Sequence, residues 1–453
     1  MDNLIIPKQI HSLNKREFFS LLLIINIIKM KKTISIIVVL SLFTACSTDK
    51  SQKGQVTDIP QVEQLQINKV ELAHKDTIAA ETSAKKIVKP QQSVEKAPFA
   101  TNKQINITYK GKDRNRIVKA VDIFKNIHYV PLETNDAALL AEPYCIVLRD
   151  NYIYILDIKM SGNEIHLYDS DGKYIRHIGQ KGQGPNDYLG GLHIAVNGKG
   201  MLSLPDRIRS EIINYTQEGE FVSRIRMDTI SMIKDIFLND SLLLVQNFYD
   251  RSGYKFHVVD VFNRKVIRAF HPIKNRVYMV GFPGTMTRYK DKILISECQS
   301  NDVLEVTLDG VKVRYTININ DKMPPEGFWD QKASSYSLIA DENRRMGYIG
   351  HIPCFTETDH SIFFGFRGLV PATETQGWAL IDKVSGKSQT FKKIELAENV
   401  CINPQIFHFV EEGKIVMTVS PETILNSGNQ EFISQFPNLK EDDNPILMFA
   451  EIK

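Results

Sequence analysis

The chain has 453 residues, of which 43% are hydrophobic and 9% aromatic, and its formal net charge is +3 at pH 7. This apolar content excludes a fully disordered protein. Residues 1–45 contain six Lys or Arg and two acidic residues, so they account for +4 and leave a charge of −1 on the rest of the chain. A nearly neutral body gives no support to a nucleic-acid partner, which requires a concentrated basic surface.

The N-terminal region has the pattern of an export signal. An apolar run, residues 18–28, is followed by three lysines around Met30 and then by apolar residues 33–45, which end in small side chains. Read from Met30, this is a basic segment and an apolar core that is shorter than the roughly 20 residues needed to span a bilayer. We therefore predict that residues 1–45 are a signal peptide region whose true start is Met30. The alternative is a membrane anchor made of both apolar runs.

The sequence Leu-Phe-Thr-Ala-Cys at residues 42–46 resembles a bacterial lipoprotein box. The resemblance implies that Cys46 is lipidated, becomes the mature N-terminus and attaches the protein to a membrane. Phe43 departs from the pattern, because an aliphatic residue is usual there. The alternative is plain secretion. Residues 46–104 are polar and have Phe99 as their only aromatic residue, so they are predicted to form a flexible linker.

The remaining cysteines favour neither a metal site nor a redox motif. They are far apart in the sequence and form no C-x-x-C pair, which argues against a zinc ribbon or a thioredoxin-like site. Each stands in an apolar, strand-like context, and we expect buried free thiols rather than disulfides; the four are Cys145, Cys298, Cys354 and Cys401.

Residues 105–453 are predicted to form an all-β domain that repeats internally. Residues 164–178 (EIHLYDSDGKYIRHI) and 211–225 (EIINYTQEGEFVSRI) align at an offset of 47, and further copies follow at offsets of 92 and 138. A fifth copy begins at Trp378, after an insertion at about residues 320–350. A period near 46 with four short strands is typical of a β-propeller blade, although tandem hairpin sandwiches could also repeat. The length favours six blades, with seven as the alternative.

Three segments resemble a known family. The run from Ile178 to Tyr188, together with residues 129–134 and 443–447, resembles the uncharacterised six-bladed β-propeller lipoproteins of Gram-negative anaerobes. This chain has Asn186-Asp187 where that family usually has Gly-Glu. The resemblance implies a fold related to NHL and TolB-like propellers and a place in the cell envelope, at the outer membrane or its periplasmic face. It implies no established activity and no catalytic residues.

The glycine-rich run is predicted to be the crossover from the outer strand of one blade to the inner strand of the next. Gly182 and Gly184 permit unusual backbone angles, Pro185 fixes one turn dihedral, and Tyr188, after Asp187, can fill the gap between blades. We interpret this motif as a clasp between blades, with a ligand-contacting loop as the alternative. It is not a phosphate-binding loop, because no Gly-Lys-Ser/Thr follows.

Loops that emerge on the same face as this crossover supply the candidate ligand contacts, because propellers bind partners where such loops converge. In the insertion, Trp329 could stack on a sugar, and an arginine pair could bind carboxylates. The alternative is a helix that packs its aromatic residues against the barrel. The ligand-binding candidates are Asp157, Arg207, Arg209, Arg251, Trp329, Arg344 and Arg345.

No catalytic or metal-binding constellation is visible in the sequence. The histidines form no H-x-x-H or H-E-x-x-H set, so a metal site would require convergence in three dimensions, and there is no G-x-S-x-G motif. We predict a lipid-anchored, non-catalytic binding module without a cofactor, whose funnel binds a glycan, a peptide or an envelope protein. The alternatives are a propeller hydrolase or lyase acting on glycans and a purely structural scaffold. We also expect residues 127–133 and 444–452 to pair in one blade and close the ring.

Overall fold

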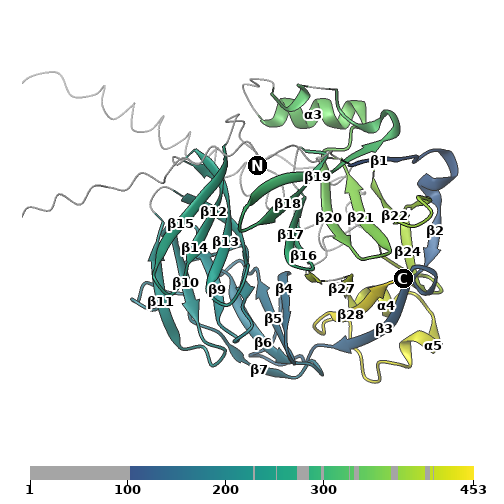
Figure 1. Cartoon of the computed structure of the whole chain (residues 1–453). Helices are drawn as coiled ribbons and strands as arrows, with labels where there is room; N and C mark the ends of the chain where they lie inside the picture. Colours follow the sequence, from purple (N-terminus) through teal and green to yellow (C-terminus); the bar gives the residue numbers. More distant parts are fainter. Residues whose placement is uncertain are drawn as a thin grey trace, which may run out of the picture. The chain divides into compact units, whose positions relative to one another are not determined.

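Short antiparallel strands repeat along the chain in the computed structural model (Figure 1). It describes residues 103–453 except 228–229, 251–252, 273–284, 297–299, 326, 331–335, 369–375, 403–408 and 412. The predicted signal region, Cys46 and most of the linker therefore lie outside the described residues, as do Cys298 and Arg251. None of the described helices is both long enough and apolar enough to cross a membrane.

Four sheets consist of four strands that follow one another along the chain, and we number the blades in chain order. Blade 1 contains β4 (Pro143–Arg149), β5 (Tyr152–Asp157), β6 (Glu164–Asp169) and β7 (Tyr174–His177). Blade 2 contains β8 (Ala195–Val196), β9 (Leu202–Asp206), β10 (Glu211–Tyr215) and β11 (Phe221–Arg226). Blade 3 contains β12 (Ile230–Phe237), β13 (Leu242–Asp250), β14 (Tyr254–Asp260) and β15 (Lys265–Pro272). Blade 5 contains β20 (His351–Glu357), β21 (Ser361–Arg367), β22 (Gln376–Asp382) and β23 (Ser388–Phe391).

A nine-stranded sheet contributes two further blades, which are joined by a parallel bridge between Arg288 and Glu411. Blade 4 consists of β16 (Met286–Tyr289), β17 (Lys292–Ser296), β18 (Asp302–Thr307) and β19 (Gly310–Ile319), with β1 (Lys103–Ile107) added at its edge. Blade 7 consists of β26 (Phe409–Glu411), β27 (Lys414–Val419), β28 (Ile446–Ile452) and β3 (Phe124–Pro131).

A three-stranded sheet makes the expectation of six blades wrong. It contains β24 (Lys393–Ala397), β25 (Val400–Ile402) and β2 (Ile117–Lys119), and we number it blade 6. The described part of the chain thus holds seven blades. The repeat in the sequence follows contiguous hairpins, whereas this blade takes its edge strand from a segment more than 270 residues upstream, where Ile117 pairs with Lys393.

The predicted closure of the ring is confirmed. β28 pairs antiparallel with β3, and Ile446 lies opposite Pro131 while Met448 lies opposite Tyr129. The first strands of blades 1, 2, 3, 4 and 7 also contact one another: β4 touches β8 and β26, β12 touches β8 and β16, and β16 touches β26. Strands that are far apart in the sequence thereby complete a circuit and leave fewer exposed sheet edges.

The cores lie between neighbouring blades. On β6, four consecutive residues, Ile165 to Tyr168, are buried, so both faces of the strand are covered. Tyr154 of blade 1 packs in one cluster with Leu204 and Tyr215 of blade 2. Burying such a side chain fully contributes about 1.5–3 kcal/mol, and this inter-blade packing explains the paired apolar positions in the sequence.

Helices are confined to connections. The insertion after β19 contains short 3-10 turns at Asn320–Lys322 and Phe328–Asp330 and then α3 (Tyr336–Met346); a similar turn occurs at Gly111–Asn115. α2 (Ala120–Ile123) precedes β3, while α4 (Pro421–Leu425) and α5 (Gln430–Ile433) lie between β27 and β28. The expectation that disulfides are absent is confirmed for Cys145 and Cys354, which are buried and form none; Cys401 also forms no disulfide but is partly exposed.

Candidate functional site

The crossover, residues 178–194, runs from the outer strand of blade 1 to the first strand of blade 2, as its sequence predicted. The Gly184 N–H donates a hydrogen bond of 2.8 Å to the carboxylate of Asp187. Neither Gly182 nor Gly184 has a positive φ, so the expected unusual backbone angles are absent; instead, a Cβ on Gly182 would lie 2.2 Å from that same carboxylate oxygen and would displace the Asp187 side chain. Tyr188 is buried, and its ring lies edge-on to that of Tyr215 in blade 2. These contacts fix the shape of the loop.

Two arginines of blade 2 hold the crossover from the other side. Arg209 donates hydrogen bonds to the carbonyl oxygens of Asp187 and Gly182, the latter at 3.0 Å. Arg224 donates to the carbonyl oxygens of Pro185 and Asp187 at 2.8 and 2.9 Å. The predicted ligand candidate Arg209 is therefore engaged within the fold, and the contacts favour the clasp interpretation of the motif.

A pocket of about 490 Å³ opens beside the crossover, between blades 1 and 2. Two cationic residues, Lys181 and Arg207, contribute to it, and no acidic residue is among those that line it. The Arg207 N–H donates to the Gly190 carbonyl, which fixes its backbone at the rim, and the residue itself is exposed. The remaining lining residues are neutral: Gly162, Asn163, Leu189, Gly190, Gly191, Leu192 and Ile208. This arrangement can accommodate an anionic group.

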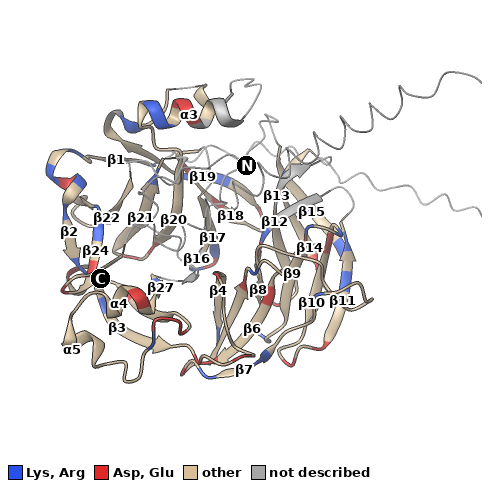
Figure 2. Cartoon of the chain, turned by 180° about the vertical axis from the view of Figure 1, so that it is seen from behind, with Lys and Arg blue, Asp and Glu red and all other residues tan. Residues whose placement is uncertain are grey.

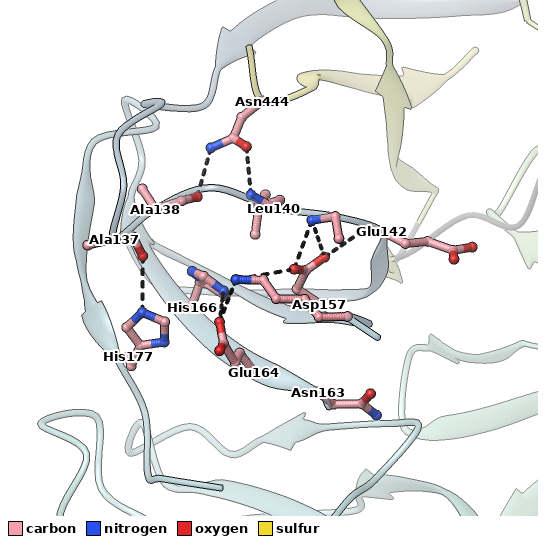
Figure 3. A network of polar contacts seen from close by, with 12 residues as sticks. Ala137, Ala138, Leu140, Glu142, Asp157, Asn163, Glu164, His166, His177 and Asn444 are labelled. Atoms are coloured by element: carbon pink, nitrogen blue, oxygen red, sulfur yellow. Dashed lines mark hydrogen bonds and ion pairs between the residues drawn. The ribbon is translucent and has the colours of Figure 1, made fainter. Parts of the chain in front are cut away.

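Asp157 lies at the end of β5 and is fully buried. Its carboxylate accepts hydrogen bonds from the backbone N–H groups of Ala141 (3.1 and 2.9 Å) and Glu142 (2.7 Å) (Figure 3). Burial raises the pKa of this carboxyl, and the two N–H donors and Lys159 oppose the shift. Asp157 thus fixes the segment that leads into β4 and does not line the pocket.

The insertion places its candidates elsewhere. Trp329 is partly exposed and lies edge-on to the buried Phe328, which also contacts Tyr348. Arg344 and Arg345 are exposed on α3 and form ion pairs with Asp341 and Glu342 of the same helix, at 3.1 and 3.8 Å. Figure 2 shows basic and acidic segments alternating on this helix. None of these residues lines the pocket, so the structure does not bring them together with Arg207.

A second group, which the sequence analysis missed, lies on the first strands of blades 1 and 3 and at the end of the crossover that leads into blade 2. We call Cys145, His193, Lys234 and Asp235 the central cluster. The Cys145 thiol contacts the His193 imidazole, whose Nδ1 lies 3.0 Å from an Asp235 carboxylate oxygen. Asp235 is fully buried, whereas the His193 side chain is 17% exposed, so one side of the cluster remains open.

The charges in the central cluster perturb one another. Burial alone would raise the pKa of the Cys145 thiol, but the adjacent His193 and Lys234 lower it overall. Burial opposes protonation of His193, yet contact with Cys145 and Asp235 raises its pKa to about 9. Burial lowers the pKa of the Lys234 amine to about 8. Both shifts have the direction found in reactive cysteines, and the Cys145 side chain is buried.

The spacing of these residues in the sequence was the signal from which the central cluster could have been predicted. Cys145, His193 and Asp235 are separated by 48 and 42 residues, close to the repeat period. Residues about one period apart come near one another in successive blades; here Cys145 and Asp235 lie on first strands and His193 lies just before one. Three other potential ligands, Glu164, His166 and His177, lie together on β6 and β7.

A family model for a domain of unknown function, DUF4934, matches residues 102–451. No curated protein matches the chain. A crystal structure from Bacteroides fragilis NCTC 9343, named provisionally as an exported protein, is similar over 77% of this chain and 99% of its own, with 17% identity and a TM-score of 0.64. A DUF4221 family member from Bacteroides vulgatus ATCC 8482 covers 73% of this chain and 97% of its own, with 10% identity and a TM-score of 0.47. A virginiamycin B lyase from Staphylococcus aureus covers 59% and 74%, with 15% identity and a TM-score of 0.35.

Proposed function

The chain belongs to the DUF4934 family, and we propose that it is a cell-envelope binding module that recognises an anionic group in the pocket beside the crossover. The observation that carries this proposal is the lining of the pocket, which contains Lys181 and Arg207 but no acidic residue. The β-propeller fold supports it, because propellers commonly bind partners at loop-lined faces.

The ligand class follows from the chemistry of the pocket. Arg207 presents a planar guanidinium that can bind a carboxylate or phosphate through two parallel hydrogen bonds. A volume of about 490 Å³ suits one acidic sugar or one amino-acid side chain with its neighbours rather than a whole folded partner. We therefore propose that the ligand is the acidic end of a glycan or of a peptide.

Binding of labelled acidic and neutral glycans and peptides to the full chain tests this function. Arg207→Ala should weaken binding of an acidic ligand by about tenfold to a hundredfold, because a hydrogen bond to a charged group contributes about 1.5–3 kcal/mol. Arg114→Ala, at an exposed position in the Gly111–Asn115 turn, is the control. Equal affinity of the Arg207 variant and the wild type would exclude this pocket. Trp329→Ala tests the insertion separately.

The location is part of the same proposal. A lipid on Cys46 would hold the propeller at the outer membrane or another face of the envelope, with the predicted linker as a tether. Growth with labelled palmitate tests it: the wild-type chain should carry the label in the membrane fraction, and the Cys46→Ala variant should not. Label retained by the variant would contradict lipidation at this residue.

The central cluster favours one competing function, a hydrolase. In this scheme the Cys145 thiolate would attack a substrate carbonyl, His193 would transfer the proton to the leaving group, and Asp235 would orient the imidazole. Such chemistry suits an ester or amide bond better than a glycosidic bond, which is cleaved by paired carboxylates. Alkylation by iodoacetamide at pH 6 is the test. Cys145 should react faster than Cys401, and His193→Ala should abolish the difference.

A further inference from the structure

Three side chains with metal-binding atoms meet on the outer strands of blade 1 (Figure 3). Glu164 and His166 are two residues apart on β6 and therefore point to the same face of the sheet. His177 lies directly opposite His166 on β7, so its side chain points to that face too. One ligand atom from each residue lies within 4.8 Å of the others.

The ring of His166 packs against those of Tyr168 and Tyr174, but its nitrogens form no hydrogen bond in the described structure. Its side chain is fully buried, and neither ring nitrogen has a hydrogen-bond partner. The carboxylate of Glu164 approaches its Nε2 to 3.5 Å, which is outside the normal range for a hydrogen bond. Because a buried polar group without a partner costs free energy, this imidazole is suited to coordinate an ion placed between it and Glu164.

His177 is already oriented as metal-binding histidines are. Its Nε2 lies 3.0 Å from the carbonyl oxygen of Ala137, which can only accept a hydrogen bond, so the proton resides on Nε2. Nδ1 therefore carries the lone pair. A histidine that binds a metal through one nitrogen usually donates its other N–H to a carbonyl or carboxylate. His177 is exposed, so an ion can enter from solvent.

Lys159 is the competitor for this site. Its ammonium nitrogen lies 2.5 Å from an oxygen of Glu164 and 3.9 Å from an oxygen of Asp157. A divalent ion on Glu164 would repel this ammonium. Because Asp157 is adjacent and also anionic, the Lys159 ammonium can move toward Asp157 and stay close to a carboxylate.

We propose that Glu164, His166 and His177 bind a divalent transition-metal ion, Zn²⁺ foremost, through one carboxylate oxygen and two imidazole nitrogens. Two histidines and one carboxylate form a common set of zinc ligands, and the fourth position is left to water. Hard ions such as Mg²⁺ and Ca²⁺ prefer all-oxygen sites, so they should bind poorly. None of the three residues lines the pocket, although Glu164 directly follows Asn163 of the lining, and the metal site does not depend on the proposed anionic ligand.

Titration of the full chain with CoCl₂ and ZnCl₂, after purification without a histidine tag and dialysis against a chelator, tests the proposal. Wild type should bind one Co²⁺ with the visible absorption of a four-coordinate site, and Zn²⁺ should displace it. His177→Ala should weaken binding at least tenfold, whereas His128→Ala, an exposed histidine on β3, should leave it unchanged. His177 is exposed, so its variant should fold, which circular dichroism will check.

Lys159→Met provides a second test, which distinguishes metal binding from a purely structural role of the two histidines. Removing the competing ammonium should tighten Co²⁺ binding several-fold, because Glu164 then has no cation to exchange. No uptake of Co²⁺ by the wild type would overturn the proposal. So would equal affinity of the wild type and His177→Ala, or weaker binding by a folded Lys159→Met variant.

Discussion

Asn444 stands at the point where the two ends of the propeller meet, and its replacement by alanine should destabilise the whole ring. Its side chain is 2% exposed. The amide nitrogen donates to the carbonyl oxygens of Glu133 (2.7 Å) and Ala138 (2.8 Å), and the amide oxygen accepts from the Leu140 N–H (2.8 Å). Asn444→Ala removes three hydrogen bonds between the segment before β28 and the loop after β3, and leaves the one from the Asn444 backbone N–H to Thr134 Oγ1.

The expected cost follows from these contacts. A hydrogen bond contributes about 1 kcal/mol net, and a buried partner left unsatisfied costs about 1–3 kcal/mol. Three lost bonds, one buried and two partly buried, therefore amount to about 3–5 kcal/mol, which is a large part of the roughly 5–15 kcal/mol that stabilises a typical protein. At about 2 °C per kcal/mol, the midpoint of thermal unfolding should fall by about 6–10 °C.

Differential scanning fluorimetry and urea unfolding of the wild type and variants measure this effect. Gln435→Ala serves as the control, because Gln435 is exposed and belongs to the same C-terminal segment. We expect the control to shift the midpoint by less than about 1 °C, since exposed substitutions usually change stability by under 0.5 kcal/mol. If Asn444→Ala behaves like this control, the amide does not hold the two ends together.

Three further predictions concern the same fold. Deleting residues 444–453 removes β28 and should abolish cooperative unfolding, whereas deleting residues 47–95 should leave the transition unchanged; both are checked by calorimetry. Gly182→Ala places a Cβ against the Asp187 carboxylate and should lower the free energy of unfolding, measured by chemical denaturation, by about 1–2 kcal/mol. Adding Asp187→Ala should lower it little further, because both substitutions disturb the same hydrogen bond, from the Gly184 N–H to Asp187. Burial lowers the pKa of His257 to about 4 from 6.5. Between these pH values the unfolded state binds more protons than the folded state, so the free energy of unfolding should fall by up to about 3 kcal/mol as the pH drops through this window. His257→Gln should flatten that pH dependence in urea titrations at pH 4–7, and an unchanged slope would contradict the assignment.

The sequence predicted the hairpins well and the number of blades poorly, for one physical reason. The copies at 164–178 and 211–225 fall on the two outer strands of blades 1 and 2, and the later copies fall on equivalent hairpins. Such hairpins are local, so their apolar pattern and turn glycines are visible in one stretch of sequence. Blade 6 has one short hairpin, β24–β25, and takes its edge strand from residues 117–119, so it lacks the contiguous outer hairpin that repeats in the other copies.

The sequence predicted those parts of the candidate site that depend on a loop motif or on an exposed charge. The motif around Gly182 identified the crossover, and Arg207 lies in the pocket beside it. Asp157 and Arg209 have the same loop context in the sequence, but the fold uses them to bind backbone groups. Which loop charge is consumed in this way depends on contacts between residues many positions apart, and a single sequence does not display them.

The N-terminal strands impose an order on how this protein can form. β1, β2 and β3 pair with β19, β24 and β28, so Lys103 must find Tyr315, Ile117 must find Lys393, and Pro131 must find Ile446. The strands of the folded domain that are synthesised first therefore stay unpaired until their partner strands, which include the last one synthesised, are available. Pairings at such long range slow folding and expose unpaired edges meanwhile. A chain of this topology benefits from remaining unfolded until it is complete, and a holding chaperone would raise its yield.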